Sequence, residues 1–366
     1  MTTAERALAL GTALEGFPNA IARGSGEMLL DLVRAELGHP EILDGFQSRE
    51  SIRSMAIAPR CILHVLAGNT PNAAIQSVAI GLLLGSANRV KLPSKAPEVG
   101  EALKRFLGQL PNQLRETVEV KVELPDVWLT DSGAVIVFGS DDTVSQLRGR
   151  IRPWQKFIAH GHRLSFGIVF KEASAGGEAA RRAASDVSLF DQLGCLSPHD
   201  VYVEESVPGE ARTFAKRLAG EMRQFNESTP RGDISPSETQ EIFHLRSGYS
   251  FRAVSDHRVA VWASRGSTEW TVIYEEDPQF AVSCLNRLVF VKPLPAPDSM
   301  AEHLRLVRPH LSTIAIWPFS ATRAEGLTRL GASRICPLGE SQSPTAFWHP
   351  DGISTLQQLV DWIDLG

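Results

Sequence analysis

Short apolar runs alternate with helix-like segments over the first half of this chain, and this alternation restricts the possible folds more than any other feature. The apolar runs lie at 61–67, 88–92, 133–138 and 167–170. Segments with helical periodicity fill the intervals between them, at 71–84, 97–110 and 141–149. Strands joined by helices pair in parallel, because each helix returns the chain to the same end of the sheet. The pattern predicts a doubly wound α/β domain.

The length of 366 residues exceeds what one hydrophobic core usually supports, so we expect two main domains. We place the parallel α/β domain at 56–171 and a second α/β domain at 172–340. Residues 1–55 read as a helical segment that packs on the first domain. The tail is 341–366, and the apolar spacing of 353–365 predicts a short amphipathic helix there.

The charge pattern and the cysteines argue against several classes of protein. A formal net charge of −5 without a dense basic run gives no reason to expect a nucleic-acid partner. The four Cys show no CxxC spacing and no grouping with His, so we expect neither a disulfide framework nor a metal site. The polar N-terminus lacks the apolar core of a signal peptide, and no apolar stretch is long enough to span a bilayer. These features predict a cytoplasmic protein without a membrane span.

One cysteine lies where its thiol could react. Cys195 follows Gly194, between a helix-like segment at 176–190 and the β-branched and aromatic run 201–203. A cysteine held exposed at such a turn can attack an acyl carbon as its thiolate. The alternative is structural, since cysteine often serves as a small buried apolar side chain.

Polar residues follow three of the predicted strands, at the edge where open α/β sheets bind ligands. Gly139 and Ser140 precede a helix, where backbone N–H groups could face a pyrophosphate or form an ordinary capped turn. The basic stretch 91–95 is either a ligand contact or a solvated turn. Asn69 could donate a hydrogen bond to an oxyanion or cap the next helix. No GxGxxG follows any of these strands, so an ordinary dinucleotide fingerprint is absent.

These elements, taken in order, resemble the aldehyde dehydrogenase superfamily over roughly residues 55–300. The intervals between Asn69, Lys91, Gly139 and Cys195 are 22, 48 and 56 residues, close to that superfamily's pattern. The resemblance implies that Cys195 is the nucleophile and that Asn69 helps to form the oxyanion hole.

The same resemblance implies a cofactor site and an architecture. Lys91 and Ser94 would bind the adenosine ribose, and Gly139 and Ser140 would lie at the cofactor phosphates. The implied fold is α/β and aldehyde-dehydrogenase-like, with a Rossmann-type cofactor domain and an α/β catalytic domain that carries Cys195.

Within the superfamily, three stretches resemble the acyl-CoA reductases, such as the fatty acyl-CoA reductase of the bacterial luminescence type: residues 67–71, 195–198 and 284–287. This resemblance implies an enzyme that forms a covalent acyl-cysteine and reduces it.

A departure from the oxidative members supports the same direction of reaction. Those members carry a Glu that activates water to hydrolyse the acyl-enzyme, whereas the corresponding stretch here, 159–164, has no carboxylate. An acyl-cysteine thioester would then persist long enough to accept a hydride. His160 or His162 could act as general acid or base, or could belong to a polar turn between strands.

A second departure concerns the cofactor. Relatives that prefer NAD often place a Glu three residues after the Lys, but this position is Ser94 and is followed by Lys95. Losing a carboxylate and gaining a cation favours the 2′-phosphate of NADPH, with Lys95 as a further contact. We also expect a homo-oligomer or a subunit of a biosynthetic complex. Because the chain is shorter than most of the superfamily, chiefly at the N-terminal end, we expect the usual oligomerisation flap to be reduced or missing.

The sequence therefore predicts NADPH-dependent reduction of an acyl thioester, carried by coenzyme A or a carrier protein, to an aldehyde. One alternative is an acyl-phosphate reductase, for which the candidate anion-binding residues are Arg246, Arg252 and Arg258. Another alternative is a catalytically silent, acyl-binding partner subunit.

Overall fold

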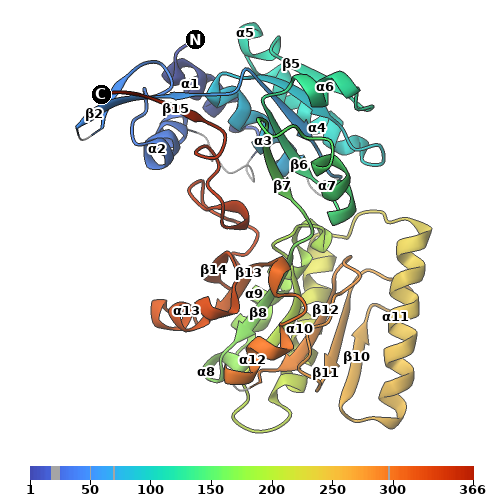
Figure 1. The fold of residues 1–366 in the computed structure, drawn as a ribbon. Helices are drawn as coiled ribbons and strands as arrows, with labels where there is room; N and C mark the ends of the chain where they lie inside the picture. Colours follow the sequence, from blue (N-terminus) through green and yellow to red (C-terminus); the bar gives the residue numbers. More distant parts are fainter. Residues whose placement is uncertain (18–24, 50, 69–70, 296) are drawn as a thin grey trace. The chain divides into compact units, whose positions relative to one another are not determined.

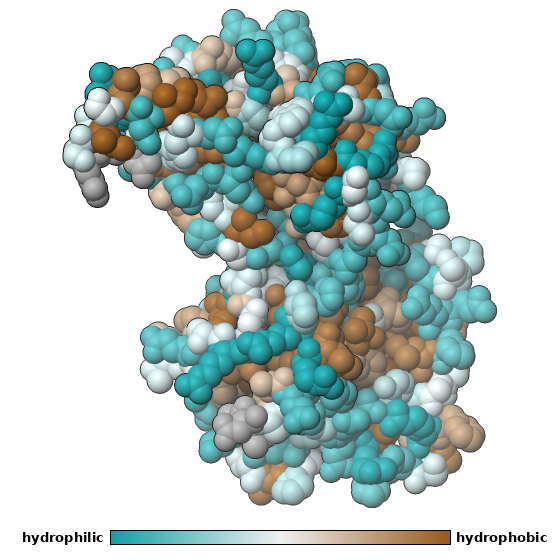
Figure 2. Space-filling model, viewed as in Figure 1, coloured by the Kyte–Doolittle hydropathy of each residue, from teal (hydrophilic) through white to brown (hydrophobic). Residues whose placement is uncertain are grey.

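The computed structural model describes residues 1–17, 25–49, 51–68, 71–295 and 297–366. The chain forms two compact units, and each is described by itself. Unit 1 consists of residues 1–162 and 344–366, and unit 2 consists of residues 163–343 (Figure 1). Figure 2 shows hydrophilic residues over much of the visible face of the units.

Unit 1 is built on a five-stranded sheet in the order β5-β4-β3-β6-β7. All its strands are parallel, and the described bounds are β3 Cys61–Val65, β4 Ala87–Lys91, β5 Val118–Lys121, β6 Ala134–Phe138 and β7 Lys156–His160. The strand order reverses between β3 and β6, which is the arrangement of a doubly wound sheet. The predicted parallel α/β domain is therefore present.

Helices cover this sheet, and α3 (Pro71–Leu84) is the most deeply placed because apolar residues occupy nearly all its faces. Side chains of α1 (Thr3–Leu14), α2 (Gly26–Leu37) and α4 (Pro97–Gly108) share a core with α3. The shorter helices of the unit are α5 Asn112–Arg115, α6 Asp126–Asp131, α7 Asp141–Arg148 and the 3₁₀ turn η4 Pro350–Gly352.

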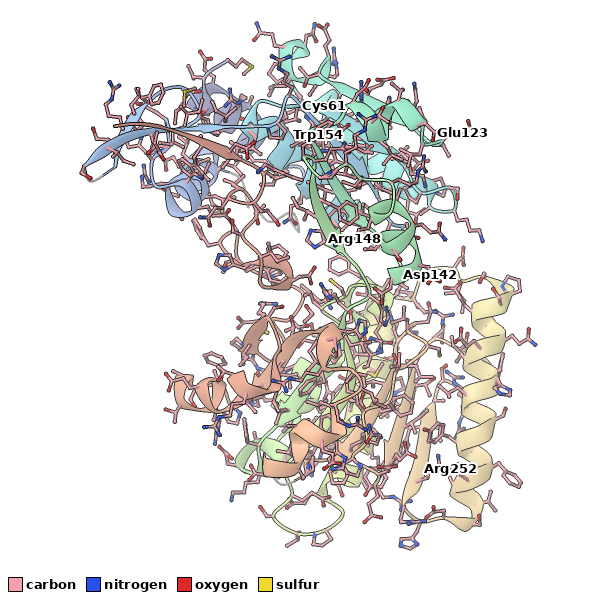
Figure 3. All side chains as sticks on the ribbon, in the orientation of Figure 1. Cys61, Glu123, Asp142, Arg148, Trp154 and Arg252 are labelled. Carbon is pink, nitrogen blue, oxygen red and sulfur yellow. The ribbon has the colours of Figure 1, made fainter. Side chains whose placement is uncertain are left out.

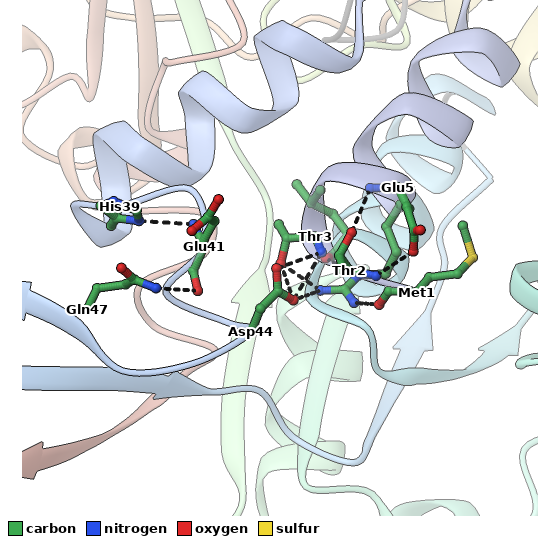
Figure 4. A network of polar contacts seen from close by, with 10 residues as sticks. Met1, Thr2, Thr3, Glu5, His39, Glu41, Asp44 and Gln47 are labelled. Carbon is green, nitrogen blue, oxygen red and sulfur yellow. Dashed lines mark hydrogen bonds and ion pairs between the residues drawn. The ribbon is translucent and has the colours of Figure 1, made fainter.

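The first helix is fixed at its N-terminus by polar contacts (Figure 4). The Thr2 hydroxyl accepts a hydrogen bond from the Glu5 N–H, and the Glu5 carboxylate accepts one from the Thr2 N–H. This capping box satisfies two N–H groups that a helix start leaves without partners. The Asp44 carboxylate accepts from the Thr3 N–H at 3.0 Å and so joins the helix to the segment that follows α2.

The predicted tail helix over 353–365 is wrong. Residues Asp361–Leu365 form strand β15, which pairs antiparallel with β2 (Ile52–Ile57) in a three-stranded sheet with β1 (Gln47–Arg49). The apolar spacing of the tail is compatible with a helix, but the exposed edge of β2 offers its backbone N–H and C=O groups as partners. A partner about 300 residues away in the chain overrides the local periodicity.

Unit 2 is built on a seven-stranded sheet in the order β10-β11-β12-β9-β8-β13-β14, parallel except for β10. The strands are β8 Leu164–Val169, β9 Pro198–Val203, β10 Val259–Ala263, β11 Thr271–Glu275, β12 Leu288–Pro293, β13 Leu311–Trp317 and β14 Arg334–Pro337.

Alternate residues of these strands contribute to two cores, one on each face of the sheet. One core includes α9 (Gly177–Ser188) and α10 (Glu210–Ser228), and the other includes side chains near α12 (Pro297–His303) and α13 (Ala321–Leu327). The helix α11 (Pro236–Ser255) contributes to a smaller cluster. The remaining helical bounds are α8 Lys171–Ser174, η1 Leu189–Gln192, η2 Arg308–His310 and η3 Thr328–Leu330.

The boundary between the units differs from the predicted one at residues 171 and 172. It lies between His162 and Arg163, so strand β8 belongs to unit 2. Every residue of β8 is buried, and the strand is hydrogen-bonded between β9 and β13. Both partner strands come later in the sequence, and local periodicity could not show which sheet would take β8.

Candidate active site

The predicted cofactor elements meet at one edge of unit 1. Because its sheet is parallel, the carboxyl ends of β3, β4, β6 and β7 lie at the same edge. Gly68 follows β3, Lys91 ends β4, Gly139 follows β6 and His160 ends β7. The proposed oxyanion donor Asn69 lies outside the described residues.

The turns after β3 and β4 are in contact. A Cβ added at Gly68 would lie 2.7 Å from the Cβ of Ala96, so this position accepts only glycine without movement of its neighbour. The Leu66 N–H donates to the Lys91 carbonyl at 3.0 Å. Ser94 and Lys95 are exposed in the turn that leads to α4, and both are accessible to a ligand at this edge.

The turn after β6 caps the following helix. The Ser140 hydroxyl accepts from the Thr143 N–H at 3.3 Å and is the N-cap of α7. A Cβ added at Gly139 would lie 3.3 Å from the Thr143 side chain, which would have to move by a few tenths of an ångström. Asp141 and Asp142 follow in the first turn, and Asp142 is labelled in Figure 3. The capped turn foreseen as the structural alternative is therefore formed.

His160 is the last residue of β7 rather than part of a turn. Its ring stacks on Phe138, with 4.6 Å between ring centroids and 17° between ring planes. The Nδ1 atom lies 2.6 Å from a carboxylate oxygen of Asp351, which comes from the C-terminal part of unit 1. Sequence reasoning missed Asp351, because no local motif links it to His160.

Cys195 lies in unit 2 on the turn between η1 and β9, and its side chain is exposed. The Ser197 N–H donates to the Gly194 carbonyl at 3.0 Å, and the Ser165 hydroxyl donates to the Cys195 carbonyl at 2.8 Å. A Cβ added at Gly194 would lie 2.9 Å from Oε1 of Gln342. Glycine therefore lets the turn pass beside Gln342 while Cys195 faces outward.

The other cysteines are poorly suited to nucleophilic chemistry. Burial raises the pKa of the Cys284 thiol to about 11 and that of the Cys336 thiol to about 12, so both are protonated near neutral pH. Cys61 belongs to unit 1, and its Sγ lies 3.8 Å from the Ser132 hydroxyl. Of the four cysteines, all of which are described, only Cys195 is exposed.

Comparison with known proteins places this chain in a family. A family model described as Acyl-CoA reductase (LuxC) matches residues 12–362. The chain belongs to this acyl-CoA reductase family. This confirms the family resemblance that the sequence motifs indicated.

Curated relatives of this reductase family agree with the match. The chain is 24% identical to a long-chain acyl-protein thioester reductase of Aliivibrio fischeri over 351 residues, which cover 93% of this chain and 71% of that protein. It is 22% identical to the protein of the same name from Vibrio harveyi over 350 residues, with the same coverage of 93% and 71%.

Solved structures confirm the predicted aldehyde-dehydrogenase-like fold. An NAD-dependent benzaldehyde dehydrogenase from Corynebacterium glutamicum aligns with a TM-score of 0.67 and 14% identity, covering 100% of this chain and 86% of that one. The putative aldehyde dehydrogenase PutA from Anabaena variabilis gives a TM-score of 0.68 and 14% identity, covering 99% and 87%.

The three arginines considered for acyl-phosphate binding all contact oxygens of the protein itself. Arg246 is buried and donates to protein oxygens, including the Trp270 carbonyl at 2.7 Å, and burial lowers its pKa to about 10. Arg252 on α11 (Figure 3) donates to Glu275 at 2.8 Å. Arg258 pairs with Asp256. Each guanidinium already has a protein acceptor.

Among the described residues, no group of three or more His, Cys, Asp or Glu side chains could hold a metal ion. Among the helices of the same residues, none is long and apolar enough to cross a membrane.

Proposed function

We propose that this chain reduces an acyl thioester to an aldehyde with NADPH, through a covalent acyl group on Cys195. The observation that carries the proposal is the exposed Cys195 on a glycine turn, while burial keeps Cys284 and Cys336 protonated. Membership of the acyl-CoA reductase family and the names of the curated relatives support the substrate class. The acyl carrier is coenzyme A or a protein thiol.

The residues at the carboxyl edge of unit 1 fit a phosphorylated dinucleotide in part. Lys91 and Lys95 supply two cations and Ser94 a hydroxyl, and the sequence 91–95 contains no carboxylate to repel a 2′-phosphate. Asp141 opposes anion binding at the start of α7, although one of its carboxylate oxygens accepts from the His162 N–H at 2.9 Å. We therefore assign the 2′-phosphate to the turn after β4, with NADPH supplying a hydride when bound.

The chain's own part of the reaction begins with Cys195. Its thiolate attacks the acyl carbonyl carbon, a new C–S bond forms, and the bond to the carrier thiol breaks. The Cys195 N–H and the Asn69 amide would donate to the developing oxyanion. Once a hydride has reached the acyl carbon, the C=O bond forms again as the C–S bond breaks, so the aldehyde leaves and Cys195 returns as a thiolate. The carrier thiolate expelled in the first step takes up one proton.

We propose that His160 is the general acid or base of the reaction. Its Nδ1 faces the Asp351 carboxylate at 2.6 Å, so Nδ1 carries the hydrogen and Nε2 is available as acceptor in the neutral ring. The same contact engages one oxygen of the Asp351 carboxylate, because that oxygen faces His160.

Mass spectrometry of the protein after mixing with acyl-CoA of increasing chain length tests the proposal. We expect an adduct of acyl mass on the peptide that contains Cys195, and its loss together with NADPH oxidation and aldehyde formation. A catalytically silent partner subunit would bind the acyl compound without either change. An adduct that is lost only by hydrolysis would contradict the reductase assignment.

A further inference from the structure

Two short segments of unit 2 have an unusual backbone, and they lie against each other. Phe190, Asp191 and Gln192 all have φ between 53° and 64°, and so do the three consecutive residues 285–287. Residues other than glycine seldom adopt this left-handed conformation, because the Cβ crowds the following carbonyl. Three such residues in a row persist only where the surroundings hold them. The first of these segments ends three residues before Cys195.

Gln192 connects the two segments with its side-chain amide. It is completely buried. Its Oε1 accepts from the Leu288 N–H at 2.8 Å, and its Nε2 donates to the Leu288 carbonyl at 2.8 Å and to the Ser283 hydroxyl at 3.2 Å. Nε2 also donates to the Pro198 carbonyl at 2.8 Å, on the other side of the Cys195 turn. One amide therefore joins both ends of this turn to the segment 283–288.

An ion pair fixes the same two segments a second time. The Asp191 carboxylate lies 2.6 Å from a guanidinium nitrogen of Arg287, whose side chain is 2% exposed. Arg287 also donates to the Asn226 side chain and to the Thr229 carbonyl, each at 2.9 Å. The other carboxylate oxygen of Asp191 accepts from the Gly232 N–H at 3.0 Å. A buried guanidinium with this many acceptors holds one position.

The attachment continues into the strand after Cys195. The His199 Nδ1 accepts from the Ser283 N–H at 3.1 Å, and the buried Asp200 carboxylate accepts from the Ala281 N–H at 3.2 Å. Side chains on both sides of Cys195 thus hold the same segment, 281–288.

We propose that Gln192, supported by the Asp191–Arg287 ion pair, is a positioning residue that fixes the Cys195 turn relative to segment 283–288. This inference rests on the proposed role of Cys195 as acyl acceptor. A thiolate must meet the carbonyl carbon at a defined distance and angle, and a displacement of about 1 Å can cost roughly a hundredfold in rate. The Gln192 amide holds the turn in one geometry for this attack.

The test uses Gln192→Glu, which keeps the side-chain size and the acceptor for Leu288 but loses all donated hydrogen bonds. In the wild type and the variant we would measure acylation of Cys195 by hexadecanoyl-CoA and its alkylation by iodoacetamide, both by mass spectrometry. We expect acylation to slow by roughly tenfold or more, since it needs the aligned geometry. Alkylation should change little, because iodoacetamide reaches any exposed thiolate.

A matched control is available in unit 1. Gln155 is also buried, and its amide donates to the carbonyls of Leu129 and Ser132 at 2.7 and 2.6 Å. Gln155→Glu introduces the same conflict with carbonyl oxygens away from the Cys195 turn, and it should leave the ratio of acylation to alkylation unchanged. Arg287→Lys, which retains the positive charge, is a milder variant and should give a smaller loss of acylation.

Hydrogen exchange separates this proposal from the proposed function. Gln192→Glu should speed amide exchange in peptides 190–197 and 283–288 together. If wild-type protein forms no acyl adduct, the proposed function fails and the positioning role fails with it, whereas paired exchange would then show only that Gln192 holds the two segments together. Faster exchange in one peptide only, or equal losses of acylation and alkylation, would overturn the positioning role.

Discussion

His160 and Asp351 lie 191 positions apart in the chain, yet Nδ1 of His160 is 2.6 Å from the Asp351 carboxylate. Both side chains are largely buried, with 17% and 7% exposed. The imidazole is further held by its stacking on Phe138. A histidine held by a carboxylate contact and by ring stacking has a defined ring orientation and a defined tautomer, which a general acid or base needs.

Replacing His160 tests its proposed role in proton exchange. His160→Gln should lower kcat by roughly a hundredfold or more, the usual contribution of general acid–base catalysis, with little change in KM for NADPH. Asp351→Asn should cause a smaller loss, because the ring remains but its orientation is less fixed. Steady-state NADPH oxidation with hexadecanoyl-CoA measures both.

The matched control is His162→Gln, since His162 is an exposed histidine two residues away on the same stretch. It should retain wild-type kcat. Equal losses from the two histidine variants would argue against His160 as the specific group.

Removing the proposed nucleophile should abolish reduction. Cys195→Ala is expected to lower turnover by about 10⁴-fold or more, while NADPH affinity, measured by fluorescence titration, stays near the wild-type value. Cys284→Ala is the control within unit 2, because burial keeps that thiol protonated. Retained turnover in Cys195→Ala would refute the covalent mechanism.

Lys95→Glu should narrow or reverse the preference for NADPH over NADH. A charge-assisted contact to the 2′-phosphate contributes about 1.5–3 kcal/mol, which corresponds to roughly 10- to 150-fold in affinity. Dissociation constants for both cofactors measure the effect. Lys104→Glu, an exposed charge reversal on α4, should leave the ratio of the two constants unchanged. A wild-type protein with equal constants for both cofactors would contradict the assignment.

The buried His64 should make unit 1 less stable in acid. Its Nδ1 lies 2.7 Å from the Ser77 hydroxyl and its Nε2 2.9 Å from the Asn88 side chain, and burial lowers its pKa to about 4. In the unfolded chain the His64 imidazole takes up a proton near pH 6.5, whereas in the folded chain it does so only near pH 4. Between these two values the unfolded chain therefore binds more protons than the folded chain. The contribution of His64 to the free energy of unfolding is fully present above about pH 6.5. It decreases as the pH falls to about 4, and the loss over this range is about 3 kcal/mol.

Denaturant unfolding at several pH values checks this expectation. The His64→Gln variant cannot take up the proton, so its stability should fall less steeply between about pH 6.5 and pH 4. Comparing slopes removes the contribution of other titrating groups. Parallel curves for the two proteins would show that His64 is not the group responsible.

Local sequence patterns predicted much of unit 1. The strands β3, β4 and β6 and the helices after them follow from apolar runs and helical periodicity, which depend on neighbouring residues only. Gly194 and Cys195 were also recognisable, since a glycine turn before a strand is a local feature. The elements at the carboxyl edge of the sheet followed from the parallel pairing.

The tertiary structure decided what depends on distant partners. Pairing with β2 made β15 a strand where periodicity indicated a helix, and pairing with β9 and β13 placed β8 in unit 2. The contacts of His160 with Asp351 and of Gln192 with Leu288 join residues far apart in the chain. Such contacts leave no mark on local periodicity, because the free energy of burying and pairing polar groups is set only when the folded chain brings them together.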